Sequence, residues 1–216
     1  MESPVVQEYL EAICRLQLEG RKTGTTELGR ALGVSPASAS EMADRLAEKG
    51  LVGKSKEAGI TLTEQGRKAG LAVIRTHRIS ERFLVDVLGM DWKDVHEEAC
   101  KLEHVISAEV ENRMETLLTT AATCPHGNPI PDREGRTPES RQRKLSALKQ
   151  GQSGQVARIS EERRELLEYL TSIGMMPERT VRVEQVAPFE GPLLVELNGV
   201  RYALAREIAD KVWVEE

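Results

Sequence analysis

The stretch Ser35-Pro36-Ala37-Ser38-Ala39-Ser40-Glu41 predicts a helix start that decides the fold of the first part of the chain. A serine side chain accepts from the free amides at a helix start, and proline suits the first helical position. A shorter helix precedes it, capped by Thr25 or Thr26 and ended by Gly33. Two helices joined by a glycine-containing turn, the second opening on small polar residues, indicate a helix-turn-helix.

Elements on both sides extend this motif. Apolar residues at helical spacing predict a first helix over residues 4–19. Two short strands, over 51–54 and 60–62, predict a small β-wing. Three helices and a wing are typical of DNA-binding domains. Three more helices are expected further along the chain: Glu64–Arg75 capped by Thr63, His77–Leu88, and a long helix over Asp91–Thr120.

Composition and charge exclude several classes of protein. The 216 residues carry a net charge of −5, which divides into +2 over residues 1–80 and −7 over 81–216. A mildly basic front on an acidic chain permits nucleic-acid binding there. No apolar run is long enough to span a membrane, and no signal peptide is expected. The three cysteines, 14, 100 and 124, suit a reducing cytoplasm. No P-loop, nucleophile elbow or dinucleotide fingerprint supports an enzyme.

The second half of the chain changes character twice. Residues 124–153 begin with Cys124-Pro-His-Gly-Asn-Pro-Ile-Pro131 and continue as a polar, arginine-rich segment, which predicts a flexible linker. Cys124 and His126 form either a ligand pair or an ordinary loop, and the loop is favoured. Residues 154–216 show strand-like alternation interrupted by one helix over Glu161–Thr171, and Asn198-Gly199 marks a hairpin. Five short strands there predict a small β-barrel: Val156–Ile159, Thr180–Val183, Leu193–Leu197, Val200–Leu204 and Val212–Val214.

Four potential metal ligands lie on one stripe of the predicted long helix. At about 3.6 residues per turn, His96, Cys100, Glu103 and His104 face the same side. Imidazole, thiolate and carboxylate groups are ligands for divalent transition metals. The alternative is an amphipathic helix that simply turns polar residues to water.

These residues, taken together, resemble the diphtheria-toxin-repressor family of iron- and manganese-dependent transcriptional repressors. The resemblance is carried by His77-Arg78-Ile79-Ser80-Glu81-Arg82, by His96 to Ser107, and by Gly127-Asn128-Pro129-Ile130-Pro131. It implies a mainly α fold with small β parts. The implied order is a winged helix-turn-helix over 1–74, a helical metal-binding and dimerisation domain over 75–123, the linker, and an SH3-like domain over 154–216 of a type found in a ferrous-transport accessory protein.

The resemblance also implies two metal sites. The primary site would use Glu8, Cys100, Glu103 and His104, and the ancillary site His77, Glu81 and His96. Glu11 is either a further ligand or a solvated charge. The ligands from the SH3-like domain are not assigned, because Arg163 and Leu166 fall at the aligned positions, beside Glu162 and Glu165. Fe²⁺ or Mn²⁺ is expected, because the thiolate of Cys100 is a soft ligand that favours Fe²⁺ and the carboxylate of Glu8 is a hard ligand that suits Mn²⁺. Co²⁺, Ni²⁺, Zn²⁺ or Cd²⁺ are expected as substitutes in vitro.

The expected partner is double-stranded DNA with a palindromic operator, bound by a homodimer. The sequence places the DNA contacts at the start of the third helix and on the wing, with Ala37 or Ala39 against a thymine methyl group. Two rival interpretations are a cytosolic metal-delivery or storage protein, which leaves residues 24–62 unexplained, and a metal-independent regulator with a vestigial site. The predicted DNA-binding residues are Ser35, Pro36, Ala37, Ser38, Ser40, Glu41, Arg45, Lys54 and Lys56.

Overall fold

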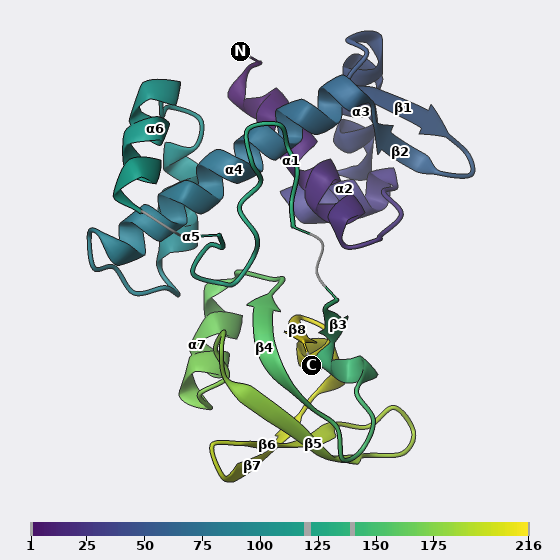
Figure 1. Cartoon of the computed structure of the whole chain (residues 1–216). Coiled ribbons are helices and arrows are strands. Elements are labelled where there is room, and N and C mark those ends of the chain that lie inside the picture. Colours follow the sequence, from purple (N-terminus) through teal and green to yellow (C-terminus); the bar gives the residue numbers. More distant parts are fainter. Residues whose placement is uncertain (1, 119–121, 139–140, 216) are drawn as a thin grey trace. The chain divides into compact units, whose positions relative to one another are not determined.

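The computed structural model describes residues 2–118, 122–138 and 141–215 (Figure 1). The chain forms two compact units. The first unit comprises Met1–His77, Leu102–Ser107 and Pro131–Thr137, and the second comprises Arg78–Lys101, Ala108–Ile130 and Pro138–Glu216. Among the described residues, no helix combines the length and the apolar character that a membrane crossing requires.

Three helices form the body of the first unit: α1 (Pro4–Leu18), α2 (Thr25–Leu32) and α3 (Pro36–Glu48). The expected serine cap is confirmed, because Oγ of Ser35 accepts from the amide of Ser38 at 3.1 Å. The expected threonine cap of α2 is wrong: its N-cap is Gly24, which has no side chain to offer. Gly33 adopts φ +67° and turns the chain from α2 into α3.

The wing is an antiparallel pair of strands, β1 (Val52–Ser55) and β2 (Gly59–Leu62). Gly59 has φ +76°, and a Cβ atom there would lie 2.4 Å from the carbonyl oxygen of Thr23. Only glycine therefore allows the wing to approach the start of α2. An aliphatic core joins the three helices to the wing; its buried members include Leu10, Ile13, Leu28, Leu46, Leu51 and Ile60.

Two expectations about the following helices are wrong. Helix α4 (Glu64–Asp86) is continuous, where two helices were expected, because no glycine or proline interrupts residues 75–77. The long helix expected over Asp91–Thr120 is divided into α5 (Val95–Leu102) and α6 (Ala108–Leu117). The β-branched pair Val105-Ile106 disfavours helix, and a serine directly precedes α6. Residues 119 and 120 lie outside the described residues.

The second unit contains a six-stranded antiparallel sheet in the order β3-β8-β4-β5-β6-β7. All five expected strands are present, and the expected hairpin is confirmed by the positive φ of Asn198 and Gly199 between β6 and β7. The elements are β3 (Arg143–Lys144), the 3₁₀ turn Leu145–Ala147, β4 (Ser153–Ile159), α7 (Arg164–Ser172), β5 (Thr180–Val186), β6 (Leu193–Leu197), β7 (Val200–Leu204), α8 (Arg206–Ala209) and β8 (Val212–Glu215).

Parts of the predicted linker belong to the second unit instead of standing apart from it. Leu145 and Leu148 are buried in the core of the sheet, together with Trp92. Earlier in the segment, a Cβ atom on Gly127 would lie 2.0 Å from the carbonyl oxygen of Ala157 on β4. The loop that begins at Cys124 therefore packs directly against the sheet. Two buried leucines within a polar segment, and one close glycine contact, are the features that the linker interpretation overlooked.

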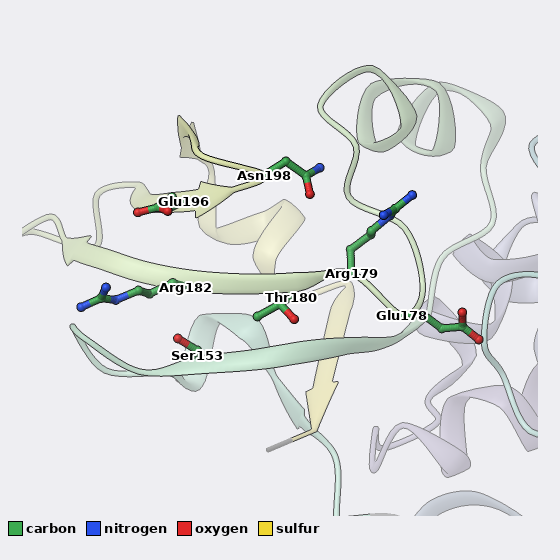
Figure 2. A pocket seen from close by; sticks show the side chains of 7 residues that line it. All are labelled: Ser153, Glu178, Arg179, Thr180, Arg182, Glu196 and Asn198. Carbon is green, nitrogen blue, oxygen red and sulfur yellow. The ribbon is translucent and has the colours of Figure 1, made fainter.

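The outer surface of the sheet has a polar pocket between β4, β5 and the β6–β7 hairpin (Figure 2). Arginine and glutamate side chains such as Arg179, Arg182 and Glu196 line it, and neither histidine nor cysteine is among its lining residues.

Candidate metal centres and nucleic-acid interface

The start of α3 presents a polar, exposed surface. Pro36, Ala37, Ser38 and Glu41 are exposed, and Ser40 is half-buried. Ala39 is fully buried in the core, so the expectation that it could touch a thymine methyl group is wrong, whereas Ala37 remains available. Small side chains on an exposed helix start allow close approach to a DNA groove.

Cationic side chains lie beside this surface and along the wing. Arg45, Lys54 and Lys56 are exposed, and Nζ of Lys54 pairs with Oδ1 of Asp44 at 2.6 Å. Lys54 and Lys56 line a pocket together with the start of α2. In that pocket, Oγ1 of buried Thr23 has no hydrogen-bond partner. Lysines around an uncapped helix start suit a phosphate group.

The first unit contains a buried cluster of two carboxylates and one imidazole. Glu11 comes from α1, His77 from α4, and Glu103 from the turn after α5. Nδ1 of His77 and Oε2 of Glu103 are 2.5 Å apart. One ligand atom from each of the three residues lies within 4.8 Å of the others, a spacing that can surround one metal ion.

His104 extends this cluster towards Glu8. Nε2 of His104 lies 3.2 Å from Oε1 of Glu103 and 3.9 Å from Oε1 of Glu8. On the other side of the ring, Nδ1 is 2.8 Å from Oε1 of Gln7. An amide oxygen can only accept, so Nδ1 carries the proton and Nε2 is the atom directed at the carboxylates. The expectation that Glu103 and His104 lie on a helix is wrong, because α5 ends at Leu102.

The charges of the first-unit cluster are unbalanced. Burial acts to raise the pKa of Glu11, but Arg15, with Nη2 2.8 Å from Oε1, and His77 together lower it. Burial and the nearby Glu11 charge raise the pKa of Glu103, although His77 opposes them. A proton or a divalent cation therefore stabilises Glu103 beside the ionised Glu11.

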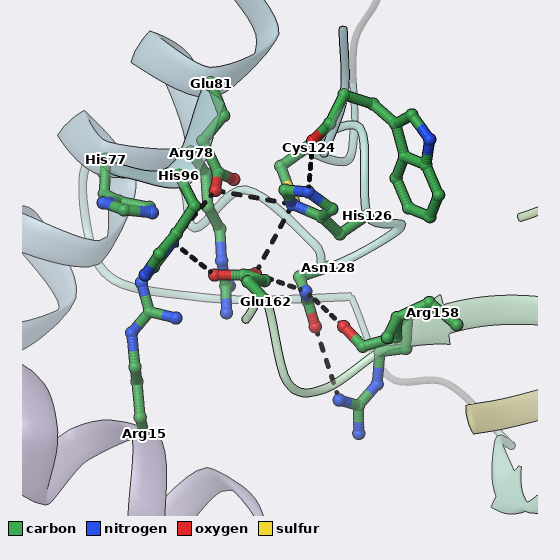
Figure 3. Close-up of polar contacts among 12 residues, drawn as sticks. Arg15, His77, Arg78, Glu81, His96, Cys124, His126, Asn128, Arg158 and Glu162 are labelled. Atoms are coloured by element: carbon green, nitrogen blue, oxygen red, sulfur yellow. Dashed lines mark hydrogen bonds and ion pairs between the residues drawn. The ribbon is translucent and has the colours of Figure 1, made fainter. Parts of the chain in front are cut away.

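The second unit contains a separate cluster built around two buried carboxylates (Figure 3). Oε1 of Glu81, on α4, lies 3.5 Å from Nδ1 of His96 and 3.4 Å from Nδ1 of His126. Glu162 precedes α7, with Oε2 3.0 Å from Nδ1 of His96 and Oε1 3.7 Å from Nδ1 of His126. Sγ of Cys124 is 3.8 Å from Nδ1 of His126. Ligand atoms of Glu81, Cys124, His126 and Glu162 all lie within 4.8 Å of one another.

Neighbouring groups orient this cluster. Nε2 of His126 donates to the carbonyl oxygen of Trp92 at 2.8 Å, which leaves Nδ1 facing the carboxylates. Nδ2 of Asn128 donates to Oε1 of Glu162 and to the carbonyl oxygen of Ile159, both at 2.9 Å. Such contacts fix the orientation of metal ligands.

The histidines of the second unit hold protons strongly in the metal-free protein. Burial would lower the pKa of His96, but hydrogen bonds to Cys100, Glu162 and Glu81 raise it to about 11. Burial likewise opposes the rise at His126, where Cys124 and Glu81 raise the pKa to about 11. The pKa of the Cys124 thiol is raised by burial and by the Glu81 charge. A bound metal would replace these protons.

The division of the expected ligands between the two units differs from their expected division between two metal sites. Glu8, Glu11, His77, Glu103 and His104 belong to the first unit. Cys100, with Sγ 3.8 Å from Nε2 of His96, belongs to the second, as do Glu81 and His96.

The sequence interpretation weighed Cys124 and His126 as a ligand pair or an ordinary loop and favoured the loop, and it left Glu162 unassigned. Both residues do lie in a loop. They are nevertheless buried, and the structure brings them within reach of Glu81 and Glu162.

Three family models match consecutive parts of the chain. They are the N-terminal DNA-binding domain of iron-dependent repressors over residues 1–60, the metal-binding and dimerisation domain of the same proteins over 63–132, and the FeoA domain over 143–216. The chain is 33% identical over 220 residues to the iron-dependent repressor IdeR of Mycobacterium tuberculosis, covering 96% of this chain and 95% of that protein. It is 32% identical to the diphtheria toxin repressor of Corynebacterium efficiens, with coverage of 96% and 94%.

Solved structures show the same similarity. A manganese-dependent transcriptional repressor in complex with manganese superposes with a TM-score of 0.91 at 38% identity, over 97% of this chain and 98% of that one. ScaR with bound Zn²⁺ superposes with a TM-score of 0.87 at 32% identity, over 98% and 99% of the two chains.

Proposed function

The chain belongs to the family of iron-dependent repressors, and on that premise we propose how its residues carry out metal-dependent repression. It is a DNA-binding transcriptional repressor that depends on Fe²⁺ or Mn²⁺, with Zn²⁺, Cd²⁺, Co²⁺ or Ni²⁺ as substitutes in vitro. We propose that it acts in the cytoplasm as a homodimer on a palindromic operator of metal-homeostasis genes. Residues 1–74 read the DNA, 75–123 bind metal and dimerise, and 154–216 form the SH3-like domain.

One observation supports this proposal: helix α1 contributes both to the core of the DNA-binding fold and to a buried cluster of potential metal ligands. Leu10 and Ile13 of α1 are fully buried in the core of the winged helix. Glu11, between them in the sequence, takes part in the buried cluster with His77 and Glu103. A metal ion bound to this cluster therefore restrains α1, which shares its core with α3, the helix proposed to contact DNA. The ion stabilises the conformation of the protein that offers it the better ligands.

We propose that Glu8, Glu103, His104 and Cys100 hold the regulatory ion, with Glu11 beside them. The 3.2 and 3.9 Å separations from Nε2 of His104 suit donors of one ion, since metal–ligand bonds of about 2.1 Å place donors up to roughly 4.2 Å apart. His77, Glu81 and His96 are the proposed ancillary ligands, and Glu162 joins them because it contacts His96. When bound, the ion supplies positive charge that gathers these ligands.

The function is tested by DNA binding in a metal titration. DNA selected from a random pool in the presence of Mn²⁺ serves as the probe, and Fe²⁺ is tested anaerobically. We expect tight binding with either metal and release on addition of a chelator. Equal binding with and without metal would support the metal-independent regulator, and metal binding without any DNA selection would support the delivery or storage protein.

Gln7 is expected to raise metal affinity without touching the ion. Gln7→Met keeps the length of the side chain but removes the oxygen that accepts from His104, so Nε2 is no longer held towards the carboxylates. The affinity for Mn²⁺ should fall about tenfold, the scale seen for groups that orient ligands. Calorimetry of metal binding measures this.

The matched control for Gln7 is Gln17→Met on the same helix, because Gln17 bonds to the carbonyl oxygen of Ile60 in the wing. Gln17→Met should leave metal affinity unchanged. An equal loss in both variants would show that α1 is merely loosened.

Glu8 is expected to influence the choice of metal. Its carboxylate is hard, and the thiolate of Cys100 is soft, so Glu8→Met should reduce activation by Mn²⁺ more than activation by Fe²⁺. The difference should be on the order of 1 kcal/mol, or about fivefold in half-activating concentration. Parallel operator titrations with Mn²⁺ and anaerobic Fe²⁺ measure it. Equal loss for both metals would mean that Glu8 only positions α1, and unchanged curves would mean that it is no ligand.

A further inference from the structure

The arginine-rich segment around β3 and β4 differs in charge from the part of the second unit that follows it. Residues 141–160 carry five Arg and Lys residues and no Asp or Glu, whereas residues 161–216 carry seven Arg and Lys residues against twelve Asp and Glu residues. Leu145 and Leu148 of this segment are buried in the core of the sheet. The cations are therefore held on a folded surface and not on a free linker.

Three of these cations are exposed: Arg141, Lys144 and Lys149. Within the described residues, their side chains form neither an ion pair nor a hydrogen bond. Two carboxylates lie on neighbouring elements: Asp210, which accepts a hydrogen bond from a serine hydroxyl, and Glu215 of β8. Neither carboxylate pairs with the three cations, so their positive charge is available to an external anion.

A tryptophan holds two cations in a row across the sheet. Lys144 of β3 and Arg158 of β4 are both opposite Trp213 of β8 in the strand register, so the three side chains share one face. Nζ of Lys144 lies 5.9 Å, and Cζ of Arg158 4.1 Å, from the centroid of the indole ring. A cation over an aromatic ring is attracted to it and loses mobility. The positive charge is therefore preorganised for an anion.

We propose that Arg141, Lys144 and Lys149 bind backbone phosphates of duplex DNA and form a second contact surface besides the winged helix. The inference rests on the proposed function, because DNA is the polyanion that the first unit is proposed to bind. The eight intervals from the first to the last cation extend at most about 28 Å, a length over which one DNA strand carries roughly eight phosphates. Each cation can therefore reach a phosphate of its own.

The surface suits the phosphates of a duplex better than single strands or lipids. An unpaired base stacks on an open aromatic face, whereas Arg158 already lies over the Trp213 ring. An anionic membrane binds most strongly where apolar side chains can insert beside the cations, and both leucines of this segment are buried. Phosphate contacts read no base sequence, so this surface should add affinity for any duplex and leave the choice of operator to the winged helix.

The salt dependence of DNA binding tests the surface. Arg141→Gln, Lys144→Gln and Lys149→Gln are combined in the full-length chain, and binding is measured with Mn²⁺ to a duplex that extends beyond the selected operator. Each lost phosphate contact makes the plot of log affinity against log salt less steep by about 0.9, so the slope should change by roughly 2.7. The affinity advantage of the parent should then shrink about 40-fold between about 50 and 200 mM salt. Lys149→Gln alone should change the slope by about 1.

The matched control combines Arg163→Gln, Arg182→Gln and Arg201→Gln. These arginines are exposed in the same unit, but they pair with Glu161 or Glu184. The control removes the same charge and should leave the slope nearly unchanged. Thermal unfolding should match the parent in both variants, because all the substituted side chains are exposed. An unchanged slope in the first variant, or an equal change in the control, would overturn the proposal.

Further arms of the experiment separate DNA from other polyanions. A first variant that keeps the DNA slope but loses binding to polyglutamate would assign the surface to an acidic protein segment, against the proposal. The same slope with lost binding to phosphatidylglycerol vesicles would assign it to a membrane, also against the proposal. Metal-dependent operator binding by the parent reports separately on the proposed function. That binding supports the function whether or not the slope changes, and a parent that binds no duplex overturns both.

Discussion

His104→Ala should abolish metal-dependent operator binding and leave a folded dimer. His104 is the ring that the structure directs at both Glu103 and Glu8, while Gln7 holds its far side. Loss of groups that merely orient ligands costs 10–100-fold in metal affinity, so loss of a ligand should exceed about 100-fold. Operator binding in a metal titration measures the effect, and circular dichroism with sedimentation checks fold and dimer.

The same substitution at His96 provides the matched control. His96→Ala removes one imidazole from the second unit and leaves every described ligand of the first unit in place. Activation should then need more metal but still reach the full level of DNA binding. If His96→Ala is as inactive as His104→Ala, the ranking of the two sites is reversed. If His104→Ala responds to metal like the parent, the regulatory site has been placed wrongly.

The local features of the fold follow from short-range rules, and for that reason the sequence predicts them. Ser35-Pro36 starts α3, Thr63 caps α4 by accepting from the amide of Gly66 at 3.1 Å, and Asn198-Gly199 closes a hairpin. Each depends on one or two residues whose side chains or backbone angles fix the local chain. The starts of α3 and α4 and the two strands of the hairpin were therefore placed within a few residues, whereas the end of α4 was not.

The sites could be predicted only in part, because they are made by contacts between distant segments. Helical periodicity predicted that Glu103 and His104 lie on the long helix, but α5 ends before them, at Leu102. The partnership of Glu81 with Cys124, His126 and Glu162 joins α4, a loop and the residues before α7. No spacing within one segment reveals such a cluster. The loop that begins at Cys124 likewise has the sequence of a linker, and only the structure shows that Gly127 in this loop lies against β4.

Ser38→Glu should separate folding from DNA binding. Ser38 is exposed in the first turn of α3, which has no acidic residue. A glutamate there completes the pattern in which a capping serine is followed three residues later by glutamate, and its charge suits the positive end of the helix. The variant should therefore be as stable as the parent or more stable by about 0.5 kcal/mol.

The same glutamate should reduce operator affinity by on the order of 100-fold, because it places a carboxylate on the surface proposed to face DNA phosphates and base edges. Metal affinity should be unchanged, since Ser38 is not among the ligands. Gln185→Glu is the charge-matched control: it adds one negative charge to an exposed position of β5 and should leave DNA binding intact. Thermal unfolding, metal calorimetry and operator titration, measured on the same preparations, distinguish the effects. A Ser38→Glu protein that still binds the operator like the parent would show that the start of α3 does not read DNA.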